Sequence, residues 1–197
     1  MTPEPNLARC FGDGNAVYEE YHDTEWGVPV RGERELYERF SLEAFQSGLS
    51  WITILRKRPS FRAAFADFDP EVVARYGEDD VVRLLADPGI VRNRAKILAT
   101  IANSHAVLRL WEDGRTLTDL VWSYAPVDGD RPRPTAFADV PAQTQESRAL
   151  ARELKAVGFR FVGPTTAYAA MQACGLVDDH LAACPVVAGR TAASVRD

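Results

Sequence analysis

Apolar residues recur at helical intervals along most of this chain, and this periodicity is the feature that most limits its fold. In the segment 34–45, Leu36, Phe40 and Ala44 are spaced by four residues, while Glu and Arg residues fall on the other side. No segment shows the period-two alternation that is typical of a strand, so the sequence predicts an all-α protein. Caps and breakers predict further helices at about 51–58, 70–75, a short one that ends near 86, 92–112, 118–124, 145–157 and 167–174.

The size and composition of the chain fit an ordinary globular protein that can bury a sizeable core. It has 197 residues, of which 46% are hydrophobic and 26% are charged. We expect an N-terminal extension over 1–8, a single domain over 9–185 that is either one body or two small helical lobes, and a disordered tail over 186–197. Four prolines mark 126–141 as a surface loop or linker.

Charge and cysteine content bear on partners and compartment. A net charge of −5 argues against a protein that coats nucleic acid nonspecifically, although it leaves room for a local basic face. Three widely spaced cysteines do not form the paired framework of a secreted protein. The first residues lack the pattern of a signal peptide, and no run of about 18 apolar residues could span a membrane. We therefore expect a monomeric cytoplasmic protein without a membrane partner.

A lone carboxylate, Glu43, lies in a weakly polar and aromatic run that ends at Trp51. A solvated helix face would carry several charges, so Glu43 is either a satisfied core residue or a functional group. The eight positions between Glu43 and Trp51 correspond to about 80° on a continuous helix. Gly48 must bend the chain between them if both are to face one site.

Aromatic residues are dense in the segment 18–26, which contains Tyr18, Tyr21 and Trp26. Such clusters usually belong to a core. Tyr21 differs because it precedes His22, a possible metal ligand that would fix the direction of the tyrosine hydroxyl group. The segment is therefore either core packing or part of a preorganised hydrogen-bonding site.

Four potential metal ligands lie near the two ends of the chain: Cys10, His22, His180 and Cys184. A Cys2His2 set holds zinc tetrahedrally and leaves no position for water, so its role would be structural. His180 and Cys184 are four residues apart, and we expect both to project from one face of a helix. The long separation of the two pairs leaves a second interpretation open, in which these are satisfied polar or core residues. Cys174 lies among small residues and is expected in the core.

A glycine-bearing turn joins two helical patterns within 158–175. Free backbone amides at such a turn, and at the N-terminus of the following helix, can bind a phosphate without basic side chains. Gly163, Thr165 and Thr166 are the candidates. The alternative is a corner between helices that serves only for packing.

The chain also carries a series of short motifs, which are Arg9-Cys10, Tyr21-His22-Asp23, Glu25-Trp26-Gly27-Val28-Pro29, Leu42-Glu43, Gly48-Leu49-Ser50-Trp51-Ile52-Thr53, Gly163, Met171-Gln172-Ala173-Cys174-Gly175-Leu176-Val177 and Asp179-His180. In this order, from about residue 9 to residue 184, the motifs resemble those of the 3-methyladenine DNA glycosylase I family. They are highly specific when they occur jointly.

The resemblance implies a compact all-α domain of the helix-hairpin-helix glycosylase type. Such an enzyme flips 3-methyladenine out of double-stranded DNA and excises it by hydrolysing the N-glycosidic bond. Its partners would be DNA with alkylated bases and free 3-methyladenine as the product. The resemblance also implies one structural Zn²⁺ per chain, which joins the N- and C-terminal segments and is held by Cys10, His22, His180 and Cys184.

Carried over from the family, Glu43 and Tyr21 hydrogen-bond the flipped base, Trp51 stacks on it and Trp26 forms a wall of the pocket. Methylation at N3 makes adenine cationic. An indole and an ionised carboxylate would therefore select the base by its charge more than by its size.

The sequence departs from the family pattern in two places. Phe11-Gly12 stands where the family often has a tryptophan, which would open one wall and favour a broader range of alkylated bases. Asp178 stands where the family often has asparagine. It is either the N-cap of a last helix or a catalytic group that supports the sugar cation or the attacking water.

DNA contact by an acidic protein requires local phosphate sites, for which the amides of Gly163, Thr165 and Thr166 are the first candidates. A further interpretation remains open, in which a zinc-stapled helical module binds nucleic acid without catalysis. Basic support, unless these are merely solvated charges, would come from Arg56, Lys57, Arg92, Arg94 and Lys96.

Overall fold

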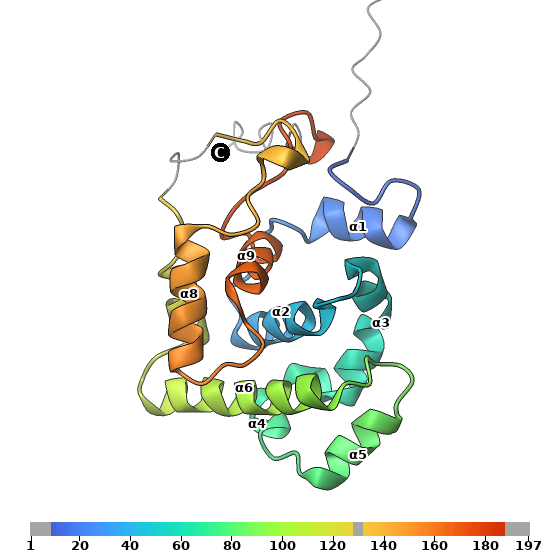
Figure 1. The fold of residues 1–197 in the computed structure, drawn as a ribbon, viewed down its shortest axis with the longest axis vertical. Helices are drawn as coiled ribbons and strands as arrows, with labels where there is room; N and C mark the ends of the chain where they lie inside the picture. The colour runs from blue at the N-terminus through green and yellow to red at the C-terminus, as the bar shows by residue number, and fades with distance from the viewer. Residues whose placement is uncertain (1–8, 128–131, 188–197) are drawn as a thin grey trace, which may run out of the picture.

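The structure, a computed structural model, describes residues 9–127 and 132–187, and all regular secondary structure in these two ranges is helical (Figure 1). The predicted all-α class is confirmed. The expected N-terminal extension and nearly all of the expected tail lie outside the described residues. The elements are α1 (Ala16–Thr24), α2 (Glu33–Gln46), α3 (Trp51–Ala64), η1 (Ala66–Phe68), α4 (Pro70–Val73), α5 (Glu78–Ala86), α6 (Arg94–Glu112), α7 (Leu117–Trp122), η2 (Phe137–Asp139), α8 (Gln145–Ala156) and α9 (Pro164–Ala173).

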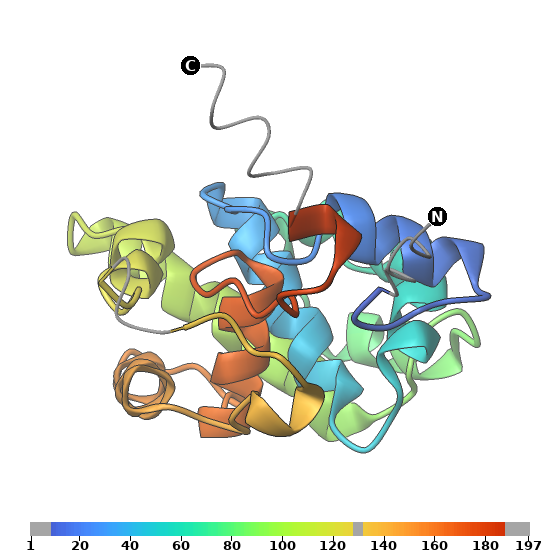
Figure 2. The same ribbon diagram turned by 90° about the horizontal axis from the view of Figure 1, so that it is seen from above.

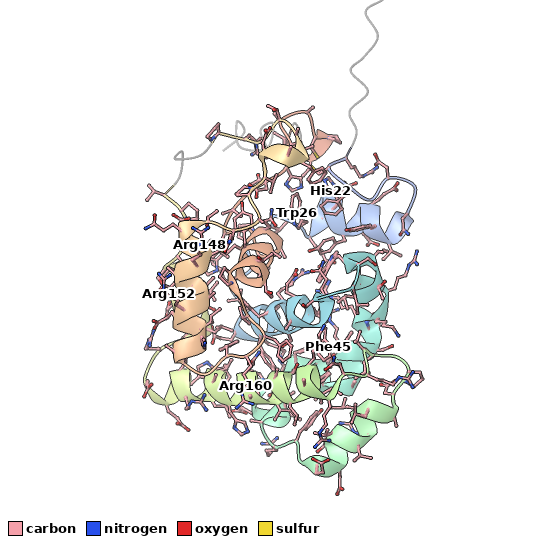
Figure 3. All side chains as sticks on the ribbon, in the orientation of Figure 1. His22, Trp26, Phe45, Arg148, Arg152 and Arg160 are labelled. Atoms are coloured by element: carbon pink, nitrogen blue, oxygen red, sulfur yellow. The ribbon has the colours of Figure 1, made fainter. Side chains whose placement is uncertain are left out.

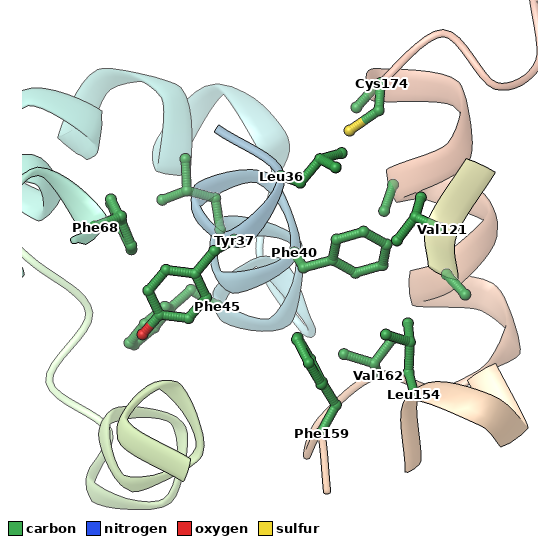
Figure 4. Packing of buried hydrophobic residues seen from close by; sticks show 14 of the residues in the cluster. Leu36, Tyr37, Phe40, Phe45, Phe68, Val121, Leu154, Phe159, Val162 and Cys174 are labelled. Carbon is green, nitrogen blue, oxygen red and sulfur yellow. The ribbon is translucent and has the colours of Figure 1, made fainter. Parts of the chain in front are cut away.

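Helix α2 runs through the middle of the molecule and packs against α3, α6, α7 and α9 (Figure 1). Its aromatic residues reach in different directions into the core (Figure 4). Phe40 packs against Phe159, with ring centroids 6.4 Å apart, and Tyr37 packs against Phe68 at 5.9 Å. Helix α2 is therefore the element around which the other helices assemble.

Helix α2 is buried all round over residues 36–45, so the Glu and Arg residues on its less apolar side do not form a solvent face. Glu38 and Arg39 are only 5% and 6% exposed. Both are ion-paired: Glu38 accepts a hydrogen bond from Arg58 of α3, and Arg39 donates to Glu25. An amphipathic pattern shows residue types but not their partners, so it places such paired charges outside by default.

The predicted bend between α2 and α3 is confirmed at Gly48, whose φ of +84° lies in the left-handed region that favours glycine. Lys96 of α6 donates hydrogen bonds to the main-chain oxygens of Phe45 and Ser47, at 2.9 and 2.7 Å. These bonds satisfy carbonyl groups that the end of a helix leaves free. The bend therefore has a defined shape, and Trp51 begins the next helix immediately after it.

Helix α3 is longer than the sequence predicts. The cations at 56–58 were expected in its last turn, but the helix continues to Ala64 with Pro59 inside it. Phe61, beyond the proline, is fully buried, and its ring centroid lies 4.6 Å from that of Phe45. This packing outweighs the backbone hydrogen bond that a proline removes.

The aromatic segment near the N-terminus forms α1, a helix that the apolar periodicity does not predict. Its signal is a cap: the Asn15 side chain accepts a hydrogen bond from the main-chain N–H of Tyr18. Figure 2 shows α1 beside the C-terminal end of the described chain.

Main-chain hydrogen bonds join the segment after α1 to the end of α9. Val30 N–H donates to the oxygen of Cys174 at 3.0 Å. Gly175 permits this approach, because a Cβ atom there would lie 2.6 Å from the backbone of Val28 and Pro29. Main-chain hydrogen bonds thus hold the segment after α1 against the end of α9.

Helices α8 and α9 form the predicted pair around a glycine-bearing turn and pack against each other. Thr144 caps α8 by accepting a hydrogen bond from the N–H of Ser147, and Gly158 follows with a φ of +105°. Both features agree with the sequence-based expectation. No helix in the described ranges is long and apolar enough to cross a membrane.

Candidate functional site

A pocket of about 350 Å³ is lined by all four residues that were predicted to contact a base. Tyr21 comes from α1, Trp26 from the turn after it, Glu43 from α2 and Trp51 from the start of α3. The bend at Gly48 therefore brings Glu43 and Trp51 to one site, as expected. The rest of the lining is Phe11, Tyr18, Gln46, Phe137, Val140, Ala169 and Gln172.

Aromatic rings make up much of the pocket wall. The rings of Tyr21 and Trp51 have centroids 5.4 Å apart and are inclined by 48°. Phe11 packs against Tyr18 at 4.8 Å and meets the edge of Trp26 at 5.0 Å. Phe11, one of the two departures from the family pattern, is therefore itself a wall residue. The pocket that these rings line offers aromatic surfaces on which a flat ligand can pack.

Two polar groups of pocket-lining residues have no hydrogen-bond partner among the described residues. Glu43 is 6% exposed, and no described residue hydrogen-bonds its carboxyl group. The indole N–H of Trp51 is buried and also has no acceptor within the described ranges. Because buried polar groups are almost always hydrogen-bonded in folded proteins, the carboxyl group of Glu43 is a group of the pocket lining that a ligand can satisfy.

Burial sets the ionisation of both groups that were predicted to hydrogen-bond the base. It raises the pKa of Glu43 to about 8, while the positive charge of Arg39 acts in the opposite direction. Burial, helped by the negative charge of Glu43, raises the pKa of Tyr21 well above its usual value. Tyr21 therefore stays protonated. Glu43 can lose its proton near neutral pH, and a cationic ligand would stabilise its carboxylate form.

The two ends of the domain meet in a buried cluster of potential metal ligands. The side-chain ligand atoms of Cys10, His22 and Cys184 all lie within 4.8 Å of one another. Figure 3 shows His22 and Trp26 together where α1 approaches the C-terminal end of the described residues. The N-terminal and C-terminal residues of the predicted metal site are thus brought together by the fold.

The chemistry of these donors fits zinc. His22 Nδ1 lies 2.8 Å from a carboxylate oxygen of Asp23, and the N–H of Cys10 points at His22 Nε2. The carboxylate therefore holds the proton on Nδ1 and leaves the Nε2 electron pair for a metal, an arrangement common in zinc sites. Burial raises the pKa of Cys10 to about 12, and the main-chain N–H of Leu181, which donates to Cys10 Sγ at 3.2 Å, acts in the opposite direction.

His180, the fourth predicted ligand, packs beside this cluster and is not among the three converging groups. Its ring centroid is 4.9 Å from that of His22 and 4.6 Å from that of Trp26. Asp178 holds its Nδ1 at 2.7 Å, while its Nε2 lies 3.5 Å from the main-chain oxygen of His22. The second histidine thus has the same carboxylate support as the first.

The expected helix through His180 and Cys184 is wrong. Residues 181–184 form a turn in which the N–H of Cys184 donates to the oxygen of Leu181. Pro185 explains the difference, because a proline disfavours helical geometry in the residue that precedes it. Cys184 reaches the cluster by this turn, not by helical spacing.

Asp178 does not line the pocket. Its carboxylate accepts hydrogen bonds from the main-chain N–H of His180 and from Arg133. Burial opposes ionisation, but the bonds from His180 and Arg133 hold the pKa of Asp178 below its usual range. No helix in the described ranges begins at Asp178. The visible contacts of this carboxylate orient His180.

The candidate phosphate-binding amides lie at the N-terminus of α9. Gly163 is the N-cap, and Thr165 and Thr166 are in the first turn, whose N–H groups have no acceptor within the helix. Gly163 and Thr165 are exposed, and Thr166 is half-buried. The hairpin therefore presents free donors to solvent, whereas none of these three residues lines the pocket.

Three of the cations that were expected to support DNA binding have other partners. Lys96 is buried under the α2 bend, Lys57 donates to the oxygen of Pro88, and Arg94 pairs with Glu78. Arg56 and Arg92 remain exposed. Three further cations are exposed, and the sequence reasoning did not single them out: Arg148 and Arg152 of α8 and Arg160 of the hairpin (Figure 3).

Some pocket residues could have been found by sequence reasoning and others could not. Tyr18 and Gln46 lie three residues from Tyr21 and Glu43 on the same helices, so helical spacing places them on the same faces. Phe137 and other residues of the loop after α7 have no periodicity that would point to a pocket.

Fold and pocket together define an all-helical protein with a site for a flat aromatic ligand, built around one buried carboxyl group. The chain belongs to the methyladenine glycosylase family, whose family model matches residues 11–187.

Characterised relatives agree with this assignment. The chain is 46% identical over 179 residues to DNA-3-methyladenine glycosylase 1 of Escherichia coli (strain K12), covering 90% of this chain and 96% of the relative. A crystal structure of 3-methyladenine DNA glycosylase I is similar with a TM-score of 0.86 at 45% identity, over 90% of this chain and 98% of that one. A structure that describes 3-methyladenine recognition by the Staphylococcus aureus glycosylase I has a TM-score of 0.83 at 34% identity, over 90% and 94% of the two chains.

Proposed function

We propose that this protein is a DNA repair glycosylase that flips 3-methyladenine out of double-stranded DNA and hydrolyses its N-glycosidic bond. The observation that carries the proposal is the unpartnered carboxyl group of Glu43 beside Trp51 and Tyr21 in one pocket. At about 350 Å³, the pocket is at the small end of ligand sites, which suits a single base. The names of the relatives support the same reaction.

The leaving group needs little help from the protein. Methylation at N3 gives the adenine ring a positive charge, so the base departs neutral when the bond between C1′ and N9 breaks and its electron pair moves to the ring. Water then adds its oxygen atom to C1′ and releases one proton. The pocket contributes by holding the extruded base out of the duplex, and general acid catalysis is dispensable.

Selection of the cationic base is the task of Glu43 and Trp51. A methyl group alone discriminates by only about 1–3 kcal/mol, whereas a desolvated cation over an indole gains about 2 kcal/mol or more. A cationic base also favours the carboxylate form of Glu43, whose pKa is near 8 in the empty pocket. Tyr21, which stays protonated, hydrogen-bonds the edge of the base.

A structural Zn²⁺ ion would be held by Cys10, His22 and Cys184, with His180 as the fourth ligand. When bound, it would fasten α1, which carries Tyr21, to the end of the chain. Asp23 and Asp178 would support the two histidines from outside, and this is the role we propose for Asp178.

DNA would be held by a helix-hairpin-helix element made of α8, the turn after it and α9. Its phosphate donors are the amides around Gly163, Thr165 and Thr166, at the positive end of the α9 dipole. Such donors let a chain with a net charge of −5 bind a polyanion.

The test is to incubate the protein with methylated duplex DNA and to identify the released bases by chromatography. The proposal expects 3-methyladenine in solution and abasic sites in the DNA. Glu43→Gln should slow the release, whereas the matched change Glu20→Gln, at an exposed position of α1, should not. Binding of DNA without release of any base would contradict the proposal and favour a module without catalysis.

A further inference from the structure

Arg39 lies one helical turn before Glu43 on α2, and both side chains are buried. Its guanidinium group donates through Nη2 to Glu25. Its Cζ atom lies 5.8 Å from the ring centroid of Tyr21. Its Nη1 atom is buried and has no hydrogen-bond partner within the described ranges. A buried guanidinium with an unused donor thus lies directly behind the pocket.

The ion pairs around Arg39 leave an excess of positive charge. Three guanidinium groups, those of Arg39, Arg58 and Arg62, meet two carboxylates, those of Glu25 and Glu38. Glu25 is shared, since its Oε2 accepts from both Arg39 and Arg58. Arg62 reaches solvent, but Arg39 and Arg58 do not. The excess charge therefore belongs to the exposed Arg62, but the buried Nη1 donor of Arg39 is unused, so this cluster favours one more negative group nearby.

Glu43 is the group placed to supply that charge. Four titratable groups interact electrostatically with Glu43. They are Tyr18 and Tyr21 from α1, Cys174 from the end of α9, and Arg39 from its own helix. Of these, Arg39 is the only cation. The two tyrosines and the buried thiol all have raised pKa values, because burial disfavours their charged forms.

We propose that Arg39 is a positioning residue that favours the carboxylate form of Glu43 against the effect of burial and thereby sets the pH range in which the pocket prefers a cationic base. The proposal rests on the proposed function for its biological meaning. The physical statement, that Arg39 controls the ionisation of Glu43, is independent of any reaction and can be measured in the free protein.

The direct measurement is a pH titration of the Glu43 side-chain carboxyl carbon by NMR in the free protein. Arg39→Met should raise the midpoint by about one pH unit or more, because a charge at this range shifts a carboxyl pKa by about that amount. Arg39→Lys should bring the midpoint back toward the wild-type value. Arg58→Met is the matched control, since it breaks the same ion-pair cluster without removing the cation next to Glu43.

Glu25→Gln distinguishes a charge effect from general damage. It removes the anion that competes for Arg39, so the midpoint of Glu43 should move down, opposite to its movement in Arg39→Met. Structural damage would move both variants in one direction. If Arg39→Met does not fold, Arg39→Lys and Glu25→Gln still decide the question.

Excision assays over the same pH range connect the midpoint to activity. The pH at which 3-methyladenine release reaches half its maximum should follow the NMR midpoint in each variant. If the wild-type protein releases no base, the proposed function fails, while the NMR comparison still tests Arg39. Equal midpoints in the wild type, Arg39→Met and Glu25→Gln would overturn the inference.

Discussion

Tyr21 and Trp51 lie 30 residues apart in the sequence, yet their ring centroids are 5.4 Å apart in the pocket wall. Tyr21 is carried by α1 and Trp51 by the first turn of α3. Their meeting depends on the bend at Gly48 and on the contacts that hold α1 to the end of α9. The pocket is thus a product of the fold, and changes outside it can alter its shape.

Ionisation of Glu43 should lower the free energy of unfolding as the pH rises. Its usual pKa is 4.5 and its pKa in the folded protein is about 8, so the folded state binds the proton more tightly. Stability therefore falls as pH rises from about 5 to about 8, with a slope approaching 1.4 kcal/mol per pH unit. Glu43→Gln has no such proton to lose.

Thermal unfolding of the wild type and Glu43→Gln between pH 5 and pH 9 measures this effect. The melting temperature of the variant, measured relative to that of the wild type, should increase as the pH rises. A constant difference across the range would show that Glu43 ionises in the folded protein as it does in water.

Loss of a zinc ligand should loosen the two ends of the domain. Cys184→Ser should abolish stoichiometric zinc, measured by metal analysis, and lower the melting temperature by several degrees. Cys174→Ser is the control, because Cys174 is an equally buried thiol that lies outside the cluster. Equal metal content in the two variants would contradict the proposed site.

The phosphate role of the hairpin can be tested at Gly163. A Cβ atom there would meet nothing within 4 Å, so a side chain can be added without a clash. Gly163→Glu should weaken DNA binding about tenfold or more at low salt, because it places a negative charge beside the phosphate site, whereas Gly163→Gln should change it little. Fluorescence anisotropy at several salt concentrations provides the measurement. Equal effects of the two changes would exclude an electrostatic role.

Asp178→Asn separates a support role from a catalytic one. Because Asp178 holds His180 and lies outside the pocket lining, we expect single-turnover excision near the wild-type rate and about 10- to 100-fold weaker zinc binding. A large loss of excision rate at full zinc content would instead assign Asp178 to the chemistry.

The sequence motifs predicted which residues line the pocket. The helical periodicity did not predict which charged residues are buried. Helical spacing and Gly48 place Glu43 and Trp51 correctly, since both signals are local. A helical pattern treats charged residues such as Arg39 as exposed by default, so it does not predict the burial of this side chain. Its burial depends on Glu25, fourteen positions earlier, and this pairing exists only in three dimensions.

The end of the chain shows the same limit. Cys184 was expected on a helix with His180, and a turn before Pro185 brings it to the cluster instead. Phe137 enters the pocket wall from a proline-rich loop whose course no periodic pattern could predict. Local signals thus predicted elements and ligand types, whereas burial and convergence depended on tertiary contacts.

The central claim is that the carboxylate of Glu43 recognises the base. It is tested most directly by calorimetric titration of 3-methyladenine, above pH 8 where Glu43 is ionised in the free protein, into the wild type, Glu43→Gln and Glu20→Gln. A hydrogen bond to a charged group contributes about 1.5–3 kcal/mol, so Glu43→Gln should bind at least about tenfold more weakly, with Glu20→Gln equal to the wild type. Equal affinity of Glu43→Gln and the wild type, with the fold intact, would contradict the claim.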